Sequence, residues 1–253
     1  MIPAAAGLVT LVCTFGGVLV GLVIRKSLPR DHVSDDSRDT IKLGIALVAT
    51  MTALVLGLVT ASAKSSFDAV DSTVKQAAAQ LLSLDRILAR YGPETALIRE
   101  ALKATVADRV DAIWSPDPSQ PARRDPLSVA QGVEHLAAQT RRLAPQTEEQ
   151  RRLQSLAVEL EESLLGARWM VFGSLGSGIP LPFLVILLFW LAITFASFGM
   201  LAPPNATVVS ILFVCALSVS AAVFLILEMD GPFEGFLIVS SEPLKYALTH
   251  LNR

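Results

Sequence analysis

The sequence has few of the residues that build metal centres, disulfides or histidine-based sites. Of its 253 residues, two are cysteine and three are histidine. Cys13 and Cys215 both lie inside apolar runs, so neither a disulfide nor a zinc site is expected. His32, His135 and His250 are scattered along the chain, and we interpret each as a surface or interface residue. No tightly bound cofactor is therefore expected.

Sequence motifs of common enzymes and of nucleic-acid binders are also missing. The chain has no phosphate loop, dinucleotide fingerprint or nucleophile elbow, so it is not expected to be an enzyme. The basic pairs Arg123-Arg124 and Arg141-Arg142 occur in a segment whose charges otherwise balance, in a chain of net charge -2. This charge pattern predicts no nucleic-acid partner.

Charged residues are scarce, at 17% of the chain, where a soluble domain carries about 25%. Hydrophobic residues make up 52% and gather in long runs without a single charge. Each run approaches or exceeds the roughly 20 residues that cross a bilayer as a helix. The sequence therefore predicts an all-α, polytopic membrane protein with four transmembrane helices. The runs are Ala4–Ile24, Leu43–Ala61, Ile179–Ala202 and Thr207–Leu227.

The absence of ionisable residues within the four runs bears on function. Proton-coupled carriers and voltage sensors need such residues near the middle of the membrane, whereas passive conduction does not. The first run is not expected to be a cleaved signal peptide, because no Lys or Arg precedes it and it is too long for an h-region.

Four spans place the N-terminus, the long middle segment and the C-terminus on one membrane face. The loop of residues 25–42 lies on the other face and holds five basic residues. The positive-inside rule therefore favours a cytoplasmic location for this loop. The middle segment is then expected outside the cytoplasm.

The middle segment shows helical periodicity throughout. No breaker separates Leu43 from Tyr91, so one helix is expected to run from the second span into this segment. Gly92-Pro93-Glu94 ends it, and residues 115–121 form a loop. The residues expected on the apolar faces of the first two helices are Phe67, Val70, Val74, Ala77, Leu81, Leu84 and Leu88, then Leu97, Ala101, Val106, Val110 and Ile113.

These patterns divide the chain into four parts. Residues 1–63 form the first transmembrane pair, 64–172 an extramembrane helical bundle, 173–228 the second transmembrane pair, and 229–253 an acidic turn with a C-terminal tail. Gly and Pro residues between 173 and 182 predict a kink before the third span.

The second span is rich in small and hydroxyl residues. One interpretation is that they allow close helix packing. The other is that one face of this helix lines a pore, since the helix is long and poor in aromatic residues. The candidate pore-lining residues are Thr50, Leu54, Gly57, Thr60 and Lys64.

Three carboxylates lie in the seven residues after the fourth span, at Glu228, Asp230 and Glu234. Negative charge at a helix C-terminus opposes the helix dipole, so cationic partners are expected. Calcium or another hard cation is one possibility, because it favours carboxylate oxygens. The alternative is a salt bridge to Lys64 or Arg168.

Asp39–Phe67, Glu228–Glu234 and Val239–Leu244 are three stretches that resemble the bacterial bestrophin-like family of unassigned function. The resemblance implies the layout of bestrophins, which are pentameric anion channels with four membrane helices, a large helical region and an acidic calcium-binding cluster after the last helix. The second run contains no Phe, so the aromatic neck of bestrophins has no counterpart here.

Two functions of different class remain open at this point. The first is a homo-oligomeric ion channel that conducts inorganic ions through a pore lined mainly by the second span, and the resemblance to bestrophins implies a pentamer. The second is a non-conducting, membrane-anchored helical module that senses a ligand or holds a partner.

Overall fold

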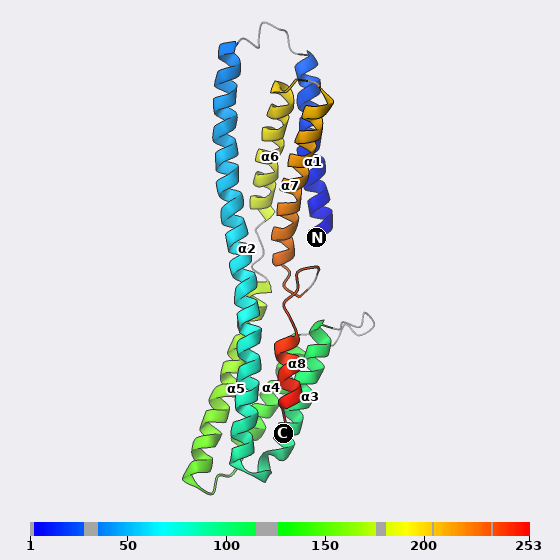
Figure 1. The fold of residues 1–253 in the computed structure, drawn as a ribbon. Coiled ribbons are helices and arrows are strands. Elements are labelled where there is room, and N and C mark those ends of the chain that lie inside the picture. The colour runs from blue at the N-terminus through cyan, green and yellow to red at the C-terminus, as the bar shows by residue number, and fades with distance from the viewer. Residues whose placement is uncertain (1–2, 28–34, 115–125, 176–180, 204, 234) are drawn as a thin grey trace. The chain divides into compact units, whose positions relative to one another are not determined.

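The structure is a computed structural model that describes residues 3–27, 35–114, 126–175, 181–203, 205–233 and 235–253 (Figure 1). Every regular element within these ranges is a helix, as the sequence predicts. The helices are α1 (Pro3–Ser27), α2 (Asp35–Tyr91), the 3-10 helix η2 (Pro93–Thr95), α3 (Ala96–Trp114), α4 (Pro126–Arg141), α5 (Glu148–Leu175), α6 (Leu181–Leu201), α7 (Ala206–Met229) and α8 (Glu242–His250).

The chain divides into two compact units. The first comprises Met1–Phe67 and Ser177–Leu237, and the second comprises Asp68–Gly176 and Ile238–Arg253. The helix α2 is continuous over 57 residues and contributes to both units, which agrees with the absence of any breaker in its sequence. The predicted loop at 115–121 and the predicted kink before α6 lie largely outside the described residues.

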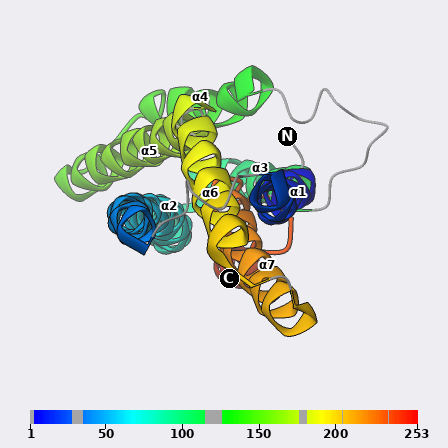
Figure 2. The same ribbon diagram turned by 90° about the horizontal axis from the view of Figure 1, so that it is seen from above.

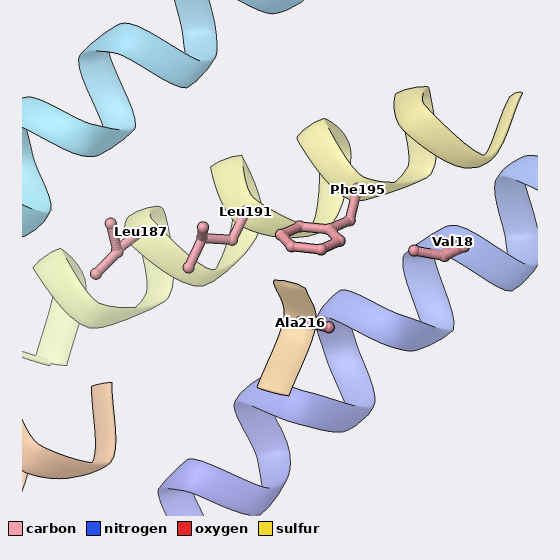
Figure 3. Close-up of a cluster of buried hydrophobic side chains, with 5 residues drawn as sticks. All are labelled: Val18, Leu187, Leu191, Phe195 and Ala216. Carbon is pink, nitrogen blue, oxygen red and sulfur yellow. The ribbon is translucent and has the colours of Figure 1, made fainter. Parts of the chain in front are cut away.

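The first unit contains four helices that are long and apolar enough to cross a membrane. Its buried cluster joins Leu187, Leu191 and Phe195, at successive turns of α6, to Val18 of α1 and Ala216 of α7 (Figure 3). The two views of the fold place α6 between α2 and α1 (Figures 1 and 2). The helix α2 thus lies at the side of this unit.

Glycines bring α1 and α6 unusually close. A Cβ atom added at Gly21 would lie 2.0 Å from the carbonyl oxygen of Ala196, and one added at Gly199 would lie 2.2 Å from that of Val18. Gly17 lies one turn before Gly21 and approaches Ala192 in the same way. This is the G-x-x-x-G pattern by which membrane helices pack backbone to backbone.

The second unit is a helical bundle with an apolar core. The part of α2 that belongs to this unit buries Val70, Val74, Leu81, Leu84 and Leu88, all of which the periodicity predicts. The predicted face of α3 is partly wrong. Its buried stripe is Ile98, Leu102, Val106 and Val110, whereas Leu97 is 78% exposed and Ala101 is only half-buried. The stripe repeats every four residues, one residue after the predicted start.

A buried carboxylate anchors the C-terminal tail in the second unit. Asp85 is 1% exposed and accepts two hydrogen bonds from the guanidinium of Arg99, at 2.8 and 3.0 Å. It also accepts one from the backbone N–H of Asn252, at 3.2 Å, while Lys103 donates to the carbonyl oxygen of Leu251. The hydrogen bond to Asp85 raises the pKa of Arg99. The tail is therefore held by charge-assisted bonds at its last residues.

Candidate functional site

The predicted pore-lining residues all lie on the exposed side of α2 in the first unit. Thr50, Leu54, Gly57, Thr60 and Lys64 are each exposed, and a Cβ atom added at Gly57 would contact nothing within 4 Å. Their spacing of three or four residues places them along one face of the helix.

The opposite face of α2 packs into its own unit. Thr52 is 5% exposed, and Val55 and Leu56 pack against the buried cluster of α1, α6 and α7. Only 6% of the most apolar stretch of α2 is buried, against 28%, 28% and 22% for α1, α6 and α7. Among the four candidate membrane spans, α2 therefore offers the largest surface to something outside its own unit.

The hydroxyl groups on α2 bond to their own helix. Thr60 donates to the carbonyl oxygen of Leu56 at 2.7 Å, and Thr50 donates to that of Ala46. Because these O–H donors are occupied, the exposed face presents methyl groups, small residues and hydroxyl lone pairs. Such a surface has no fixed charge before Lys64 and can line a weakly polar path.

The acidic turn after α7 is organised around Glu228. This carboxylate is 3% exposed, and its Oε2 atom accepts hydrogen bonds from the backbone N–H groups of Phe236, at 2.7 Å, and Leu237, at 3.4 Å. The backbone N–H of Gly231 donates to the carbonyl oxygen of Glu228 at 3.2 Å. Glu228 thus joins the end of α7 to the segment eight residues later.

Gly235 makes this arrangement possible. Its φ of 93° lies in the region that favours glycine, and an added Cβ atom would lie 2.2 Å from Oε2 of Glu228. The sequence predicts that Glu228 needs a partner, but it does not single out Gly235 as the residue that makes room for this carboxylate. The available signal was a glycine just after the acidic residues, where a chain that reverses direction often needs a positive φ.

A metal at this turn remains a prediction. Glu234 and the side chain of Arg168 lie outside the described part of the chain, so neither the predicted third ligand nor that salt bridge can be placed. Within the described residues, no group of three or more His, Cys, Asp and Glu could hold a metal ion. Glu228 and Asp230 alone fall short of the six to eight oxygens that calcium takes. Within the described residues, Glu228 has a structural role through its bonds to the backbone of Phe236 and Leu237.

The sequence matches the profile of the Bestrophin-like domain family over residues 12–244. The chain belongs to the Bestrophin-like family. The match covers all four candidate spans except the first turns of α1, and it includes the whole of the acidic turn. The resemblance inferred from the sequence is thereby confirmed.

Solved structures show that the Bestrophin-like fold extends over the whole chain. A bacterial bestrophin homologue from Klebsiella pneumoniae has a TM-score of 0.65 at 13% identity, covering 96% of this chain and 94% of the homologue. Two crystal structures described as membrane proteins have TM-scores of 0.69 and 0.61 at 12% and 14% identity. They cover 98% and 96% of this chain, and 96% and 93% of their own. No curated protein matches the sequence significantly.

Proposed function

We propose that this Bestrophin-like membrane protein is a homo-oligomeric ion channel whose pore is lined mainly by α2. The observation that supports it most is the exposure of Thr50, Leu54, Gly57, Thr60 and Lys64 on the face of α2 that points away from its own unit. A single copy leaves this face uncovered. Several copies around an axis would bring their α2 helices together with that face inward.

The composition of the spans fits passive conduction. The four candidate spans have no charged residue within their apolar stretches, so no side chain is available there for proton coupling or voltage sensing. On the exposed face of α2, Thr50, Gly57 and Thr60 have small side chains, which leave room for an ion path. Five subunits is the number that the bestrophin resemblance implies. The proposed channel conducts inorganic ions, and the reversal potential shows whether it prefers anions or cations.

Oligomeric state and conductance test this function together. The purified protein in mild detergent is expected to be an oligomer of three or more copies by light scattering coupled to size exclusion. In planar bilayers under asymmetric salt it is expected to give currents above those of empty bilayers, and the reversal potential gives the ion preference. A monomer or dimer, or the absence of current, would contradict the channel and favour the membrane-anchored helical module.

Calcium dependence tests the acidic turn separately. If a cation binds there, calcium should raise the melting temperature of the protein, because a ligand of the folded state stabilises it. Asp230→Asn should abolish that rise, whereas Glu159→Gln, which removes an exposed carboxylate of α5, should keep it. A melting temperature that does not respond to calcium in the unsubstituted protein leaves Glu228 as a purely structural group.

A further inference from the structure

A pocket of about 390 Å³ lies in the second unit, between the C-terminal part of α2 and the C-terminal helix α8. From α2 it is lined by Leu82, Ser83, Arg86, Ile87 and Arg90. From α8 it is lined by Tyr246 and His250. Its volume is within the range that holds small molecules.

Two cationic side chains face this pocket. Arg86 and Arg90 are four residues apart on α2, so their side chains lie on the same face of the helix, one turn from each other. Within the described structure, neither arginine has a hydrogen bond or an ion-pair partner, and none of the described lining residues is acidic. Two adjacent guanidinium groups are suited to a phosphate or carboxylate, which they can bind through paired N–H donors.

The α8 side of the pocket is an ordered aromatic wall. The rings of Tyr246 and His250 stack with centroids 4.2 Å apart at an interplanar angle of 30°. The Nδ1 atom of His250 lies 2.9 Å from the carbonyl oxygen of Tyr246. The hydroxyl of Thr249 also lies 2.9 Å from Nδ1, so two contacts hold the imidazole ring beside Tyr246.

Packing and hydrogen bonds hold α8, which carries this aromatic wall, in place. Ala247 and Leu251 are fully buried, and the hydrogen bonds of Lys103 to Leu251 and of Asn252 to Asp85 fix the end of α8. Tyr246 nevertheless stays 61% exposed. The aromatic wall is therefore preorganised, whereas the exposed side chains of Arg86 and Arg90 lose rotamer freedom when they bind an anion.

We propose that this pocket binds a small soluble organic anion. Its phosphate or carboxylate group lies on Arg86 and Arg90, and its apolar or aromatic body lies against Ile87 and the ring of Tyr246. Charge selects the anion, while the apolar lining favours an organic anion over an inorganic one. The proposal concerns the second unit alone and holds whether or not the protein conducts ions.

Calorimetric titration of the full-length protein in neutral detergent tests the site, with phenyl phosphate as the probe. We expect saturable binding of one probe per subunit, and weaker binding of inorganic phosphate, which lacks the aromatic body. The double variant Arg86→Gln with Arg90→Gln should weaken phenyl phosphate binding by about a hundredfold, since each charge-assisted contact contributes about tenfold or more. Tyr246→Ala should weaken phenyl phosphate but leave inorganic phosphate unchanged.

Arg152→Gln is the matched control, because Arg152 is an exposed arginine of α5 that does not line the pocket. It removes a positive charge and should leave the affinity unchanged. The elution volume in size exclusion shows that each variant is folded. Three results would each overturn the site. They are no saturable binding of phenyl phosphate, a double variant that binds it as tightly as the unsubstituted protein, and an Arg152→Gln variant that loses as much affinity as the double variant. Equal affinity for phenyl phosphate and inorganic phosphate would overturn the organic ligand.

Discussion

Glu228 and Gly235 are packed closely after α7, where a Cβ atom added at Gly235 would lie 2.2 Å from Oε2 of Glu228. Glu228 lies at the end of α7, and its carboxylate accepts hydrogen bonds from the backbone N–H groups of Phe236 and Leu237, which would otherwise bond to water. Gly235 leaves room for that carboxylate because it has no Cβ atom. The partners of Glu228 could not be predicted from the sequence, because backbone N–H groups carry no residue-specific signal. From the sequence alone, an acidic residue at position 228 could equally bind a metal cation or form a salt bridge with a basic side chain.

Gly235→Ala is expected to destabilise the protein. A non-glycine residue at a φ of 93° costs about 1–3 kcal/mol, and the new methyl group would meet Oε2 of Glu228. The melting temperature, followed by fluorescence-detected size exclusion, should fall by several degrees.

Gly231→Ala is the matched control in the same turn, because an added Cβ atom there contacts nothing within 4 Å. Its melting temperature should change little. A similar fall for both variants would show that the turn is sensitive to any added side chain, and would contradict the specific role of Gly235.

Glu161 of α5 is a second buried carboxyl group, 1% exposed in the core of the helical bundle. Burial raises its pKa, although the hydroxyl of Thr140 donates to its Oε1 atom at 2.7 Å and Arg141 acts in the opposite direction to burial. Among the described residues its Oε2 atom is buried without a hydrogen-bond partner. Keeping this group ionised therefore costs folding free energy.

The sign of the pH effect follows from the raised pKa. Between its unfolded and folded pKa values the folded state binds more protons, so stability falls as pH rises through that window. Glu161→Met removes the group that ionises and keeps most of its volume. The melting temperature should rise relative to the unsubstituted protein, and the gain should be larger at pH 8 than at pH 4.

Glu159→Met tests whether any carboxylate of α5 behaves in this way. Glu159 is exposed, so its removal should shift the melting temperature little at either pH. A Glu161→Met variant that is less stable by the same amount at both pH values would contradict the account of Glu161.

At the scale of helices, the four apolar runs of the sequence correspond to the four candidate membrane spans α1, α2, α6 and α7. Apolar runs without charge and a 3.6-residue period are strong signals, and the unbroken stretch to Tyr91 correctly predicted one helix spanning both units. The face of α3 was harder, because Leu97 and Ile98 are adjacent apolar residues and only tertiary packing decides between them. The close contact of α1 with α6 could have been found from Gly17 and Gly21, which have G-x-x-x-G spacing.

Gly21→Val is expected to separate α1 from α6. The Cβ atom of the added side chain would lie 2.0 Å from the carbonyl oxygen of Ala196. This oxygen belongs to the backbone of α6, so it cannot move aside unless α6 shifts. The variant should elute as aggregated or partly unfolded protein, or melt several degrees lower. Gly16→Val is the control on the same helix, because a Cβ atom there has nothing within 4 Å. Equal behaviour of the two variants would contradict the role of the glycine contact.

At the scale of the whole molecule, the Bestrophin-like family and its fold are established, and the proposed pore is the central claim. The sequence could predict which helix has pore-like composition, because small and hydroxyl residues gather on α2. It could not show that these residues face away from the unit, since exposure depends on how α1, α6 and α7 pack together. The subunit number depends on contacts between copies, which one chain's sequence does not encode in any simple pattern.

Accessibility of α2 to a charged, membrane-impermeant thiol reagent during bilayer recording tests this claim most directly. Cys13 and Cys215 are both exposed, so they are first replaced by alanine. Thr60→Cys places a thiol on the proposed pore face, and Thr52→Cys places one on the buried face of the same helix. The account predicts that the reagent alters the current through the Thr60→Cys protein and leaves that through Thr52→Cys unchanged. No current from the parent protein, or the same response at both positions, would contradict it.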